Sequence, residues 1–295
     1  MRDMGQVEHW LERYSGEVAR LACELEEIDE SAGLAAQANA LWFWAHNSER
    51  GDRVAVHGQR VLAGLEEVQG DTGTVVLVAA QGLCAWGLWP GEESRIREAD
   101  RLVRACWRAW EGDPQHSIGL SFWVSLLELC SHLLYAQPER ELHIIASRCV
   151  ATLLNEYYDV GTKSFMRALD YNADGLLVGE AAPAGLALKA VDAVMNEAVR
   201  CGDGRLFDWG DCCARAYASH NSPNSGAIDM LRITALRSLR HRATSWGVGW
   251  VDSELNAPDD TPEARALRQR SACLCRVELE QLAKSDGQVS GSLRY

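Results

Sequence analysis

The sequence lacks a long uninterrupted run of apolar residues. A membrane-spanning helix needs about 18 or more consecutive apolar residues, and no segment approaches that length. It also lacks an excess of positive charge. With 29 Lys and Arg against 42 Asp and Glu, the formal net charge is −13, which argues against nucleic acid as a partner because phosphate binding needs basic patches. The amphipathic, charged start of the chain does not resemble a signal or transit peptide. We therefore expect a cytoplasmic protein without a membrane span.

Several common functional motifs are missing as well. The chain contains no GxGxxG, no GxxxxGK followed by Ser or Thr, no HExxH and no GxSxG, so nucleotide, metalloprotease and serine-hydrolase chemistry have no support. Its 10 cysteines include no CxxC pair, so neither a zinc site nor a redox motif is indicated. We predict no metal and no cofactor. The cysteines within apolar segments are expected to be buried thiols; these are Cys84, Cys106, Cys130 and Cys149.

What the sequence does contain is an alternation of two kinds of helical segment between residues 32 and 160. Almost charge-free segments occupy 33–47, 73–89 and 119–136, and amphipathic, charged segments occupy 51–68, 92–110 and 138–158. The register repeats, because LWFW, LCAW and LCSH in the three charge-free segments superimpose at spacings of 42 and 46 residues. A period of this length, with two helices per unit, is typical of stacked helical hairpins.

The alternation predicts the fold. A helix that is apolar on all sides is enclosed, whereas a helix with a polar face borders solvent. We therefore predict an all-α fold of two layers, with the charge-free helices inside. Such layers form an α/α toroid or a curved solenoid, here of about 11 or 12 helices. One domain is expected over 1–295, with regular hairpins at 32–160, divergent repeats with longer loops at 161–285 and a frayed tail at 286–295. No strand-type alternation is present.

Local signals predict the ends of helices. A break is expected at Pro90-Gly91 and a helix end at Gly51. His57 lies beside a predicted hairpin turn, and we expect it to face solvent. Helix N-caps are expected at Asp208, Asp211, Asp259 and Asp260.

The chain also holds 11 tryptophans, which have two possible roles. Large indole rings can fill the core where helical hairpins meet. They can instead line an inner cavity that binds an apolar, aromatic, cationic or sugar-like ligand. Under the second interpretation the ligand-binding residues are Trp42, Trp44, Trp86, Trp123, Trp209 and Trp246.

Three polar residues are candidate acids or bases. His132 takes the position that Trp44 and Trp86 hold in the first two repeats, and it is either a cavity-facing acid or base or a core histidine. Asp170 and Asp174, in the sequence DYNAD, would face the same way on a helix. In an apolar pocket such a pair can share a proton and act as a general acid, or bind a divalent cation. The same residues also suit a helix end and a turn.

Two classes of function remain open. The first is a helical-repeat protein that binds a small hydrophobic or aromatic molecule, or a protein partner, on a Trp-rich inner surface. The alternative is an enzyme, a cyclase, lyase or isomerase acting on a hydrophobic or aromatic small molecule, with Asp170, Asp174 or His132 as acid and base. The scaffold resembles that of class II terpenoid cyclases and lanthionine cyclases, but their DxDD and CHG motifs are missing, so no residue roles carry over from either family.

Overall fold

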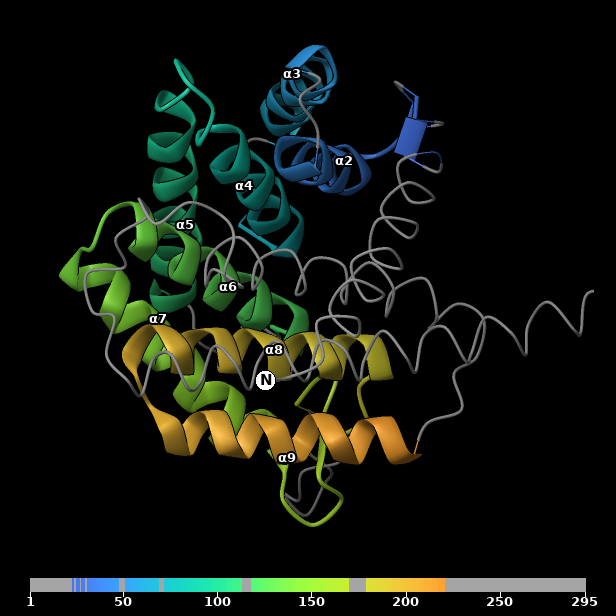
Figure 1. The fold of residues 1–295 in the computed structure, drawn as a ribbon, viewed down its shortest axis with the longest axis vertical. Helices are drawn as coiled ribbons and strands as arrows, with labels where there is room; N and C mark the ends of the chain where they lie inside the picture. Colours follow the sequence, from blue (N-terminus) through green and yellow to red (C-terminus); the bar gives the residue numbers. More distant parts are fainter. Residues whose placement is uncertain are drawn as a thin grey trace, which may run out of the picture. The chain divides into compact units, whose positions relative to one another are not determined.

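The computed structural model of the protein describes residues 23, 25, 26, 28, 29, 31–47, 51–68, 72–112, 118–169 and 179–220, drawn as coloured ribbons in Figure 1. The chain forms two compact units, Met1–Asp113 and Pro114–Tyr295. The sequence predicts one domain, and that organisation stays a prediction. Within the described ranges, no helix is long and apolar enough to cross a membrane.

The first unit contains two consecutive helical hairpins. Its described helices are α2 (Leu34–Asn47), α3 (Gly51–Glu67), α4 (Thr74–Trp86) and α5 (Ser94–Gly112). The apolar helices α2 and α4 pack against each other, α3 lies against both, and α5 packs on α4. The predicted alternation is therefore confirmed here, because charge-free helices adjoin one another and amphipathic helices cover them.

The helices α2 and α4 approach each other most closely at Gly82. A Cβ atom added there would lie 2.9 Å from the carbonyl oxygen of Ala38, so the two backbones meet with no side chain between them. Leu41 and Leu83 are fully buried beside this contact. A glycine at this position lets the inner helices pack closely and excludes water from their interface.

His57 corrects one of the sequence-based expectations. It lies within α3, not in solvent, and only 1% of its surface is exposed. Its Nδ1 donates a hydrogen bond to Oε1 of Gln37 on α2, over 2.8 Å. The expectation was wrong because residue 57 falls on the same face of α3 as the buried Val54 and Val61. Burial lowers the pKa of His57 from 6.5 to about 4, and the charges of nearby arginines act in the same direction.

This buried neutral imidazole makes the stability of the protein depend on pH. Protonation favours the unfolded chain, where the histidine pKa is 6.5. The stabilising contribution is complete above pH 6.5 and is lost as the pH falls towards about 4. In thermal unfolding followed by circular dichroism, the wild-type Tm should fall more steeply over this range than the Tm of His57→Gln. Parallel Tm–pH curves for the two proteins would show that the imidazole is not buried in its neutral form.

The connections between these helices follow the sequence signals only in part. The predicted break at Pro90-Gly91 is confirmed, and Gly91 has a φ of +86°, which glycine adopts without steric cost. The predicted helix end at Gly51 is wrong, since α3 begins there. A Cβ at Gly51 would lie 3.2 Å from the ring of Trp89. Close packing against an indole therefore explains this glycine better than helix termination does.

The second unit continues the pattern of hairpins. It contains α6 (Leu120–Ala136), α7 (Arg140–Thr152), the short π-helix η1 (Leu153–Tyr157), α8 (Ala184–Cys201) and α9 (Gly204–His220). The apolar α6 packs against both α7 and α8, and α9 lies alongside α8 (Figure 1). The helices α6 and α8 therefore hold the same relation to each other as α2 and α4 in the first unit.

A short β-hairpin follows η1. The strands β1 (Tyr158–Asp159) and β2 (Ser164–Phe165) pair in antiparallel fashion, with Tyr158 opposite Phe165. Met166 then forms an isolated antiparallel bridge to Ala181. No strand was predicted from the sequence, because two-residue strands are too short to show the alternation by which strands are recognised.

The start of α9 was also misplaced in the prediction. The side chain of Asp203 accepts hydrogen bonds from the backbone N–H groups of Arg205 and Leu206, each over 3.0 Å, and so caps the helix. The predicted caps Asp208 and Asp211 lie inside α9, so that assignment was wrong. The other predicted pair, Asp259 and Asp260, lies outside the described residues.

The four cysteines of the apolar segments are buried, as predicted; they are Cys84, Cys106, Cys130 and Cys149. Burial raises the pKa of Cys84 to about 12. It also raises the pKa of Cys149 well above its usual range, and the nearby Cys130 and Glu197 act in the same direction. Cys84 and Cys149 are therefore protonated at neutral pH, and all four side chains pack as small apolar groups.

Candidate functional site

The predicted ligand-binding tryptophans of the first three charge-free segments are enclosed by helix packing. Trp42, Trp44, Trp86 and Trp123 are each between 3% and 5% exposed. The ring of Trp86 fills the space left by Gly58, where a Cβ would lie 2.4 Å from a ring carbon. The guanidinium of Arg95 lies 4.5 Å from the centroid of the same ring. A role of these rings in ligand binding stays a prediction.

Trp209 belongs to a different aromatic cluster, between α9 and the β-hairpin. Its half-buried ring meets Tyr158 and Phe165 edge to face, with centroid distances of 5.1 and 6.1 Å. The hydroxyl of Tyr158 accepts a hydrogen bond from Sγ of Cys213 over 3.3 Å. This cluster fixes the hairpin against α9. The remaining predicted residues, Trp246, Asp170 and Asp174, lie outside the described residues.

His132 is half-buried on α6, one turn beyond Glu128. Glu128 is the single Asp, Glu, Lys or Arg in the segment 119–136. Its Oε2 lies 2.9 Å from Nζ of Lys189 on α8, and the two side chains are 13% and 12% exposed. Taking both charges out of water is costly, and the close pairing offsets that cost. The ion pair therefore joins the two inner helices of this unit.

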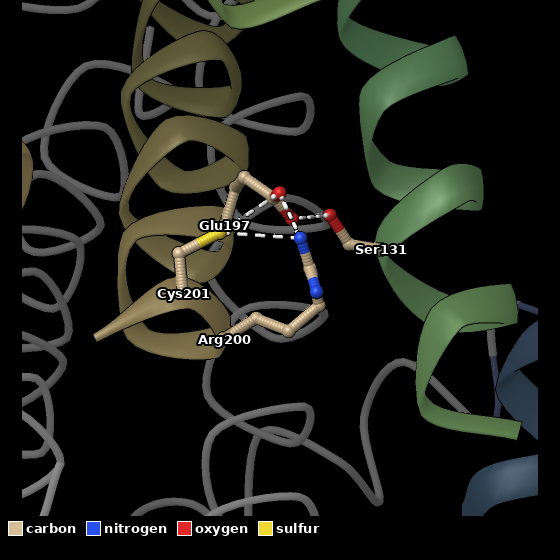
Figure 2. A network of polar contacts seen from close by, with 4 residues as sticks. All are labelled: Ser131, Glu197, Arg200 and Cys201. Carbon is tan, nitrogen blue, oxygen red and sulfur yellow. Dashed lines mark hydrogen bonds and ion pairs between the residues drawn. The ribbon is translucent and has the colours of Figure 1, made fainter. Parts of the chain in front are cut away.

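A second polar contact between the same helices centres on Glu197, which is 3% exposed. Ser131 Oγ on α6 donates to its Oε2 over 2.9 Å, and Arg200 Nε donates to the same oxygen over 2.7 Å. Arg200 Nη2 and Cys201 Sγ donate to the other oxygen, the latter over 3.2 Å. Figure 2 shows the four side chains converging, with Ser131 reaching across from α6. We call these residues the Glu197 cluster.

The Glu197 cluster has a structural role. Its carboxylate accepts a hydrogen bond from each of four donor atoms, which uses much of its acceptor capacity. Desolvation and the charge of Glu197 raise the pKa of the Cys201 thiol to about 12. Because the thiolate is the reactive form, this cysteine is a poor nucleophile. The cluster holds the C-terminal end of α8 against α6.

A third polar group lies on α8 itself. Asp192 and Asn196 are 6% and 7% exposed, and Asn196 Nδ2 donates to Asp192 Oδ2 over 3.2 Å. The Oδ1 atom of Asn196 is buried and has no hydrogen-bond partner among the described residues. Lys189, Asp192 and Asn196 follow one another at spacings of three and four residues and therefore share one face of the helix. We call these three residues the α8 polar face.

The sequence pattern did not identify the residues of α6 and α8 that form these contacts. The feature of the sequence that could have identified them is the presence of charged residues within otherwise apolar helices. Glu128 interrupts a charge-free segment, and Lys189, Asp192 and Glu197 lie in a helix rich in Ala and Val. Such charges are expected to be paired, or to serve a function, when the helix is enclosed.

Thr152, at the end of α7, gives a direct test of polar burial. Its Oγ1 is buried without a hydrogen-bond partner among the described residues, and an unsatisfied hydroxyl costs about 1–3 kcal/mol. The isosteric substitution Thr152→Val should therefore raise the free energy of unfolding by about 1 kcal/mol, measured by urea unfolding. Thr152→Ser keeps the hydroxyl and should give no gain. A valine variant less stable than the wild type would mean that the hydroxyl is hydrogen-bonded in solution.

Comparison with solved structures identifies similar chains. The α-1,6-mannanase of glycoside hydrolase family 76 from Salegentibacter sp. HEL1_6 has a TM-score of 0.60 at 11% identity, covering 88% of this chain and 91% of that chain. An inactive variant of this mannanase, substituted at two consecutive aspartates and in complex with α-1,6-mannotetrose, has a TM-score of 0.59 at 11% identity, covering 85% and 87%. A sugar epimerase from a ruminal bacterium has a TM-score of 0.55 at 12% identity, covering 86% and 77%.

At this level of identity, the likeness establishes the fold. The chain has the all-α fold of the α/α toroids to which the family 76 mannanases belong. Of the two arrangements predicted from the hairpin repeat, the toroid is therefore the correct one. No protein-family model and no curated protein sequence matches the chain.

Proposed function

We propose that the protein is an enzyme that hydrolyses a glycosidic bond in a neutral oligosaccharide. The observation that carries the proposal is the toroid fold, which the chain shares over 85–88% of its length with α-1,6-mannanases and over 86% with a sugar epimerase. All of these neighbours are named for reactions on sugars. They favour the enzymatic alternative of the sequence interpretation, with a saccharide in place of a hydrophobic substrate.

Glycoside hydrolysis requires two carboxyl groups with different roles. One protonates the oxygen of the leaving group, and the other acts as base or nucleophile. We assign these roles to Asp170 and Asp174, the pair that the sequence indicates for acid–base chemistry. His132 is a third candidate for proton transfer. The inactivity of the neighbour substituted at two aspartates supports acidic side chains as the reacting groups.

The charge of the chain supports a neutral substrate. At a net charge of −13, long-range repulsion disfavours the approach of polyanionic saccharides such as sulfated or uronic-acid polymers. Uncharged hexose oligomers encounter no such barrier. Aromatic rings stack on the apolar faces of sugars, and those of the 11 tryptophans and 7 tyrosines that are not enclosed by helix packing can contribute such contacts.

The direct test is turnover of a saccharide panel by the purified full chain. The panel contains α-1,6-mannotetraose, maltotetraose, cellotetraose and chitotetraose, and the products are followed by mass spectrometry and proton NMR. Hydrolysis gives shorter oligomers, whereas epimerisation leaves the mass unchanged and gives new anomeric signals. We expect hydrolysis of at least one member. Binding of a saccharide without either product would support a binding protein instead, and neither binding nor turnover would contradict the proposed function.

A further inference from the structure

The hydrogen bond to Asp192 shows which end of the Asn196 side-chain amide is oxygen and which is nitrogen. The amide group of an asparagine can be reversed when its surroundings do not distinguish oxygen from nitrogen. Here Nδ2 donates to a carboxylate oxygen of Asp192 over 3.2 Å, and a carboxylate oxygen can only accept. The opposite end of the amide is therefore the oxygen, and it lacks a donor among the described residues. Buried acceptors are rarely left in this state in native proteins.

The position of Asn196 makes it suitable for binding. Along α8, it lies between Lys189, which pairs with Glu128 on α6, and Glu197, which accepts a hydrogen bond from Ser131 on α6. Two contacts with the neighbouring inner helix thus fix the stretch of α8 that carries the unpartnered oxygen. Binding groups on rigid helices are positioned more accurately than groups on loops.

The charges nearby restrict the chemistry of the ligand. Of the charged side chains of α8 and α6 described here, Lys189 is positive, and Glu128 and Asp192 are negative; two carboxylates beside a single ammonium disfavour an anion. The acceptor on Asn196 requires an N–H or O–H donor. A neutral molecule with several hydroxyl groups satisfies both conditions, since each hydroxyl can donate to an amide oxygen and accept from an ammonium.

We propose that the α8 polar face is a saccharide-binding subsite in which Asn196 Oδ1 accepts a hydrogen bond from a sugar hydroxyl. Asp192 orients the asparagine through Nδ2, and Lys189 supplies a donor to the same sugar. The identity of the ligand rests on the proposed function, whereas the presence of a polar subsite on α8 does not. The role of Asn196 is positioning of the ligand, so its effect is expected in affinity and KM more than in kcat.

The test measures binding without requiring turnover. Isothermal titration of the full chain with the four tetrasaccharides gives the Kd of the wild type, and the same titration is made on Asn196→Ala. We expect a Kd at least ten-fold higher in the variant. Thr152→Val is the matched control, because it removes a buried unpartnered oxygen from α7, and its Kd should stay within two-fold of the wild-type value. An unchanged Kd in Asn196→Ala would overturn the subsite.

A second measurement uses the wild-type protein and does not depend on how the variant folds. The side-chain amide signals of Asn196 in a ¹⁵N-labelled sample should shift on addition of the saccharide that binds, while those of the half-buried Gln137, at the end of α6, should not. No shift at Asn196 overturns the proposal, as does the absence of binding by all four saccharides. Binding that depends on Asn196 without turnover would leave the subsite intact and contradict only hydrolysis. Turnover of a saccharide with the same KM in Asn196→Ala as in the wild type would support hydrolysis and contradict the subsite.

Discussion

Replacing Glu197 with alanine should lower the free energy of unfolding by about 3–5 kcal/mol. The side chain of Arg200 is only 12% exposed and donates through both Nε and Nη2 to the carboxylate. Without Glu197, the largely buried guanidinium loses the carboxylate to which it donates two hydrogen bonds. The hydroxyl of Ser131 loses its acceptor at the same time, so the contact that holds the end of α8 to α6 is removed.

The measurement is urea unfolding monitored by circular dichroism, with Glu180→Ala as the matched control. Glu180 also pairs with an arginine, Arg167, but at 3.9 Å and with side chains that are 82% and 64% exposed. An exposed pair of this kind contributes less than about 1 kcal/mol. Equal losses of stability in the two variants would mean that the Glu197 cluster is solvated in solution.

Replacing Asp170 with asparagine should reduce kcat by a factor of about 10²–10⁴, the range that general acid–base catalysis contributes. Asparagine keeps the size and hydrogen-bonding capacity of the side chain and removes its ability to exchange a proton. Asp174→Asn should have an effect of similar size, because hydrolysis requires both carboxyl groups. The loss should appear in kcat with little change in KM, since transition-state stabilisation is affected more than binding.

The assay is turnover of the saccharide identified in the panel, with the far-ultraviolet circular dichroism of each variant as the check on folding. Asp159→Asn is the control. Asp159 accepts hydrogen bonds from the backbone N–H of Gly161 and the hydroxyl of Thr162 in the β-hairpin, and its substitution should leave kcat unchanged. The chain has one pair of consecutive aspartates, Asp259 and Asp260. Loss of activity in Asp259→Asn or Asp260→Asn, with Asp170→Asn active, would move the catalytic assignment to that pair.

The helices of the repeat could be predicted because their information is local. The segment 119–136 becomes α6 over Leu120–Ala136, and 33–47 becomes α2 over Leu34–Asn47. The charge-free composition of these segments also predicts that they are enclosed. The pattern of apolar residues indicates which side of a helix is buried, without indicating which helix covers it. The bounds of these helices and their burial can therefore be predicted without knowledge of tertiary contacts.

The polar contacts of α6 and α8 depend on information that is not local. Glu128 and Lys189 are far apart in the chain, and only the packing of the two helices brings their charges to 2.9 Å. His57 combines both kinds of information, since it shares a face of α3 with the buried Val54 and Val61, and Gln37 on another helix supplies the partner of its buried imidazole. A polar residue is buried when a partner satisfies it, and a single sequence does not show the partner.

The type of ligand was the least predictable property. Tryptophan in charge-free segments suggested an apolar cavity, but the rings of Trp42, Trp86 and Trp123 are almost fully covered by the protein itself. Indole both fills cores and contacts ligands, so its frequency in the sequence does not distinguish an apolar ligand from a sugar. The proposal of a saccharide rests instead on the likeness in fold to enzymes named for reactions on sugars.

The buried thiols give each unit of the protein an internal reporter of its own opening. A thiol with a pKa of about 12, such as that of Cys84 on α4, has roughly one thiolate in 10⁵ molecules at pH 7. Alkylation therefore requires the helix to open and expose it to solvent. Cys84 reports on the first unit and Cys149 on the second. Peptide mass mapping of the modified protein gives the alkylation rate of each thiol, and comparing the two rates would show whether the two units open together or independently.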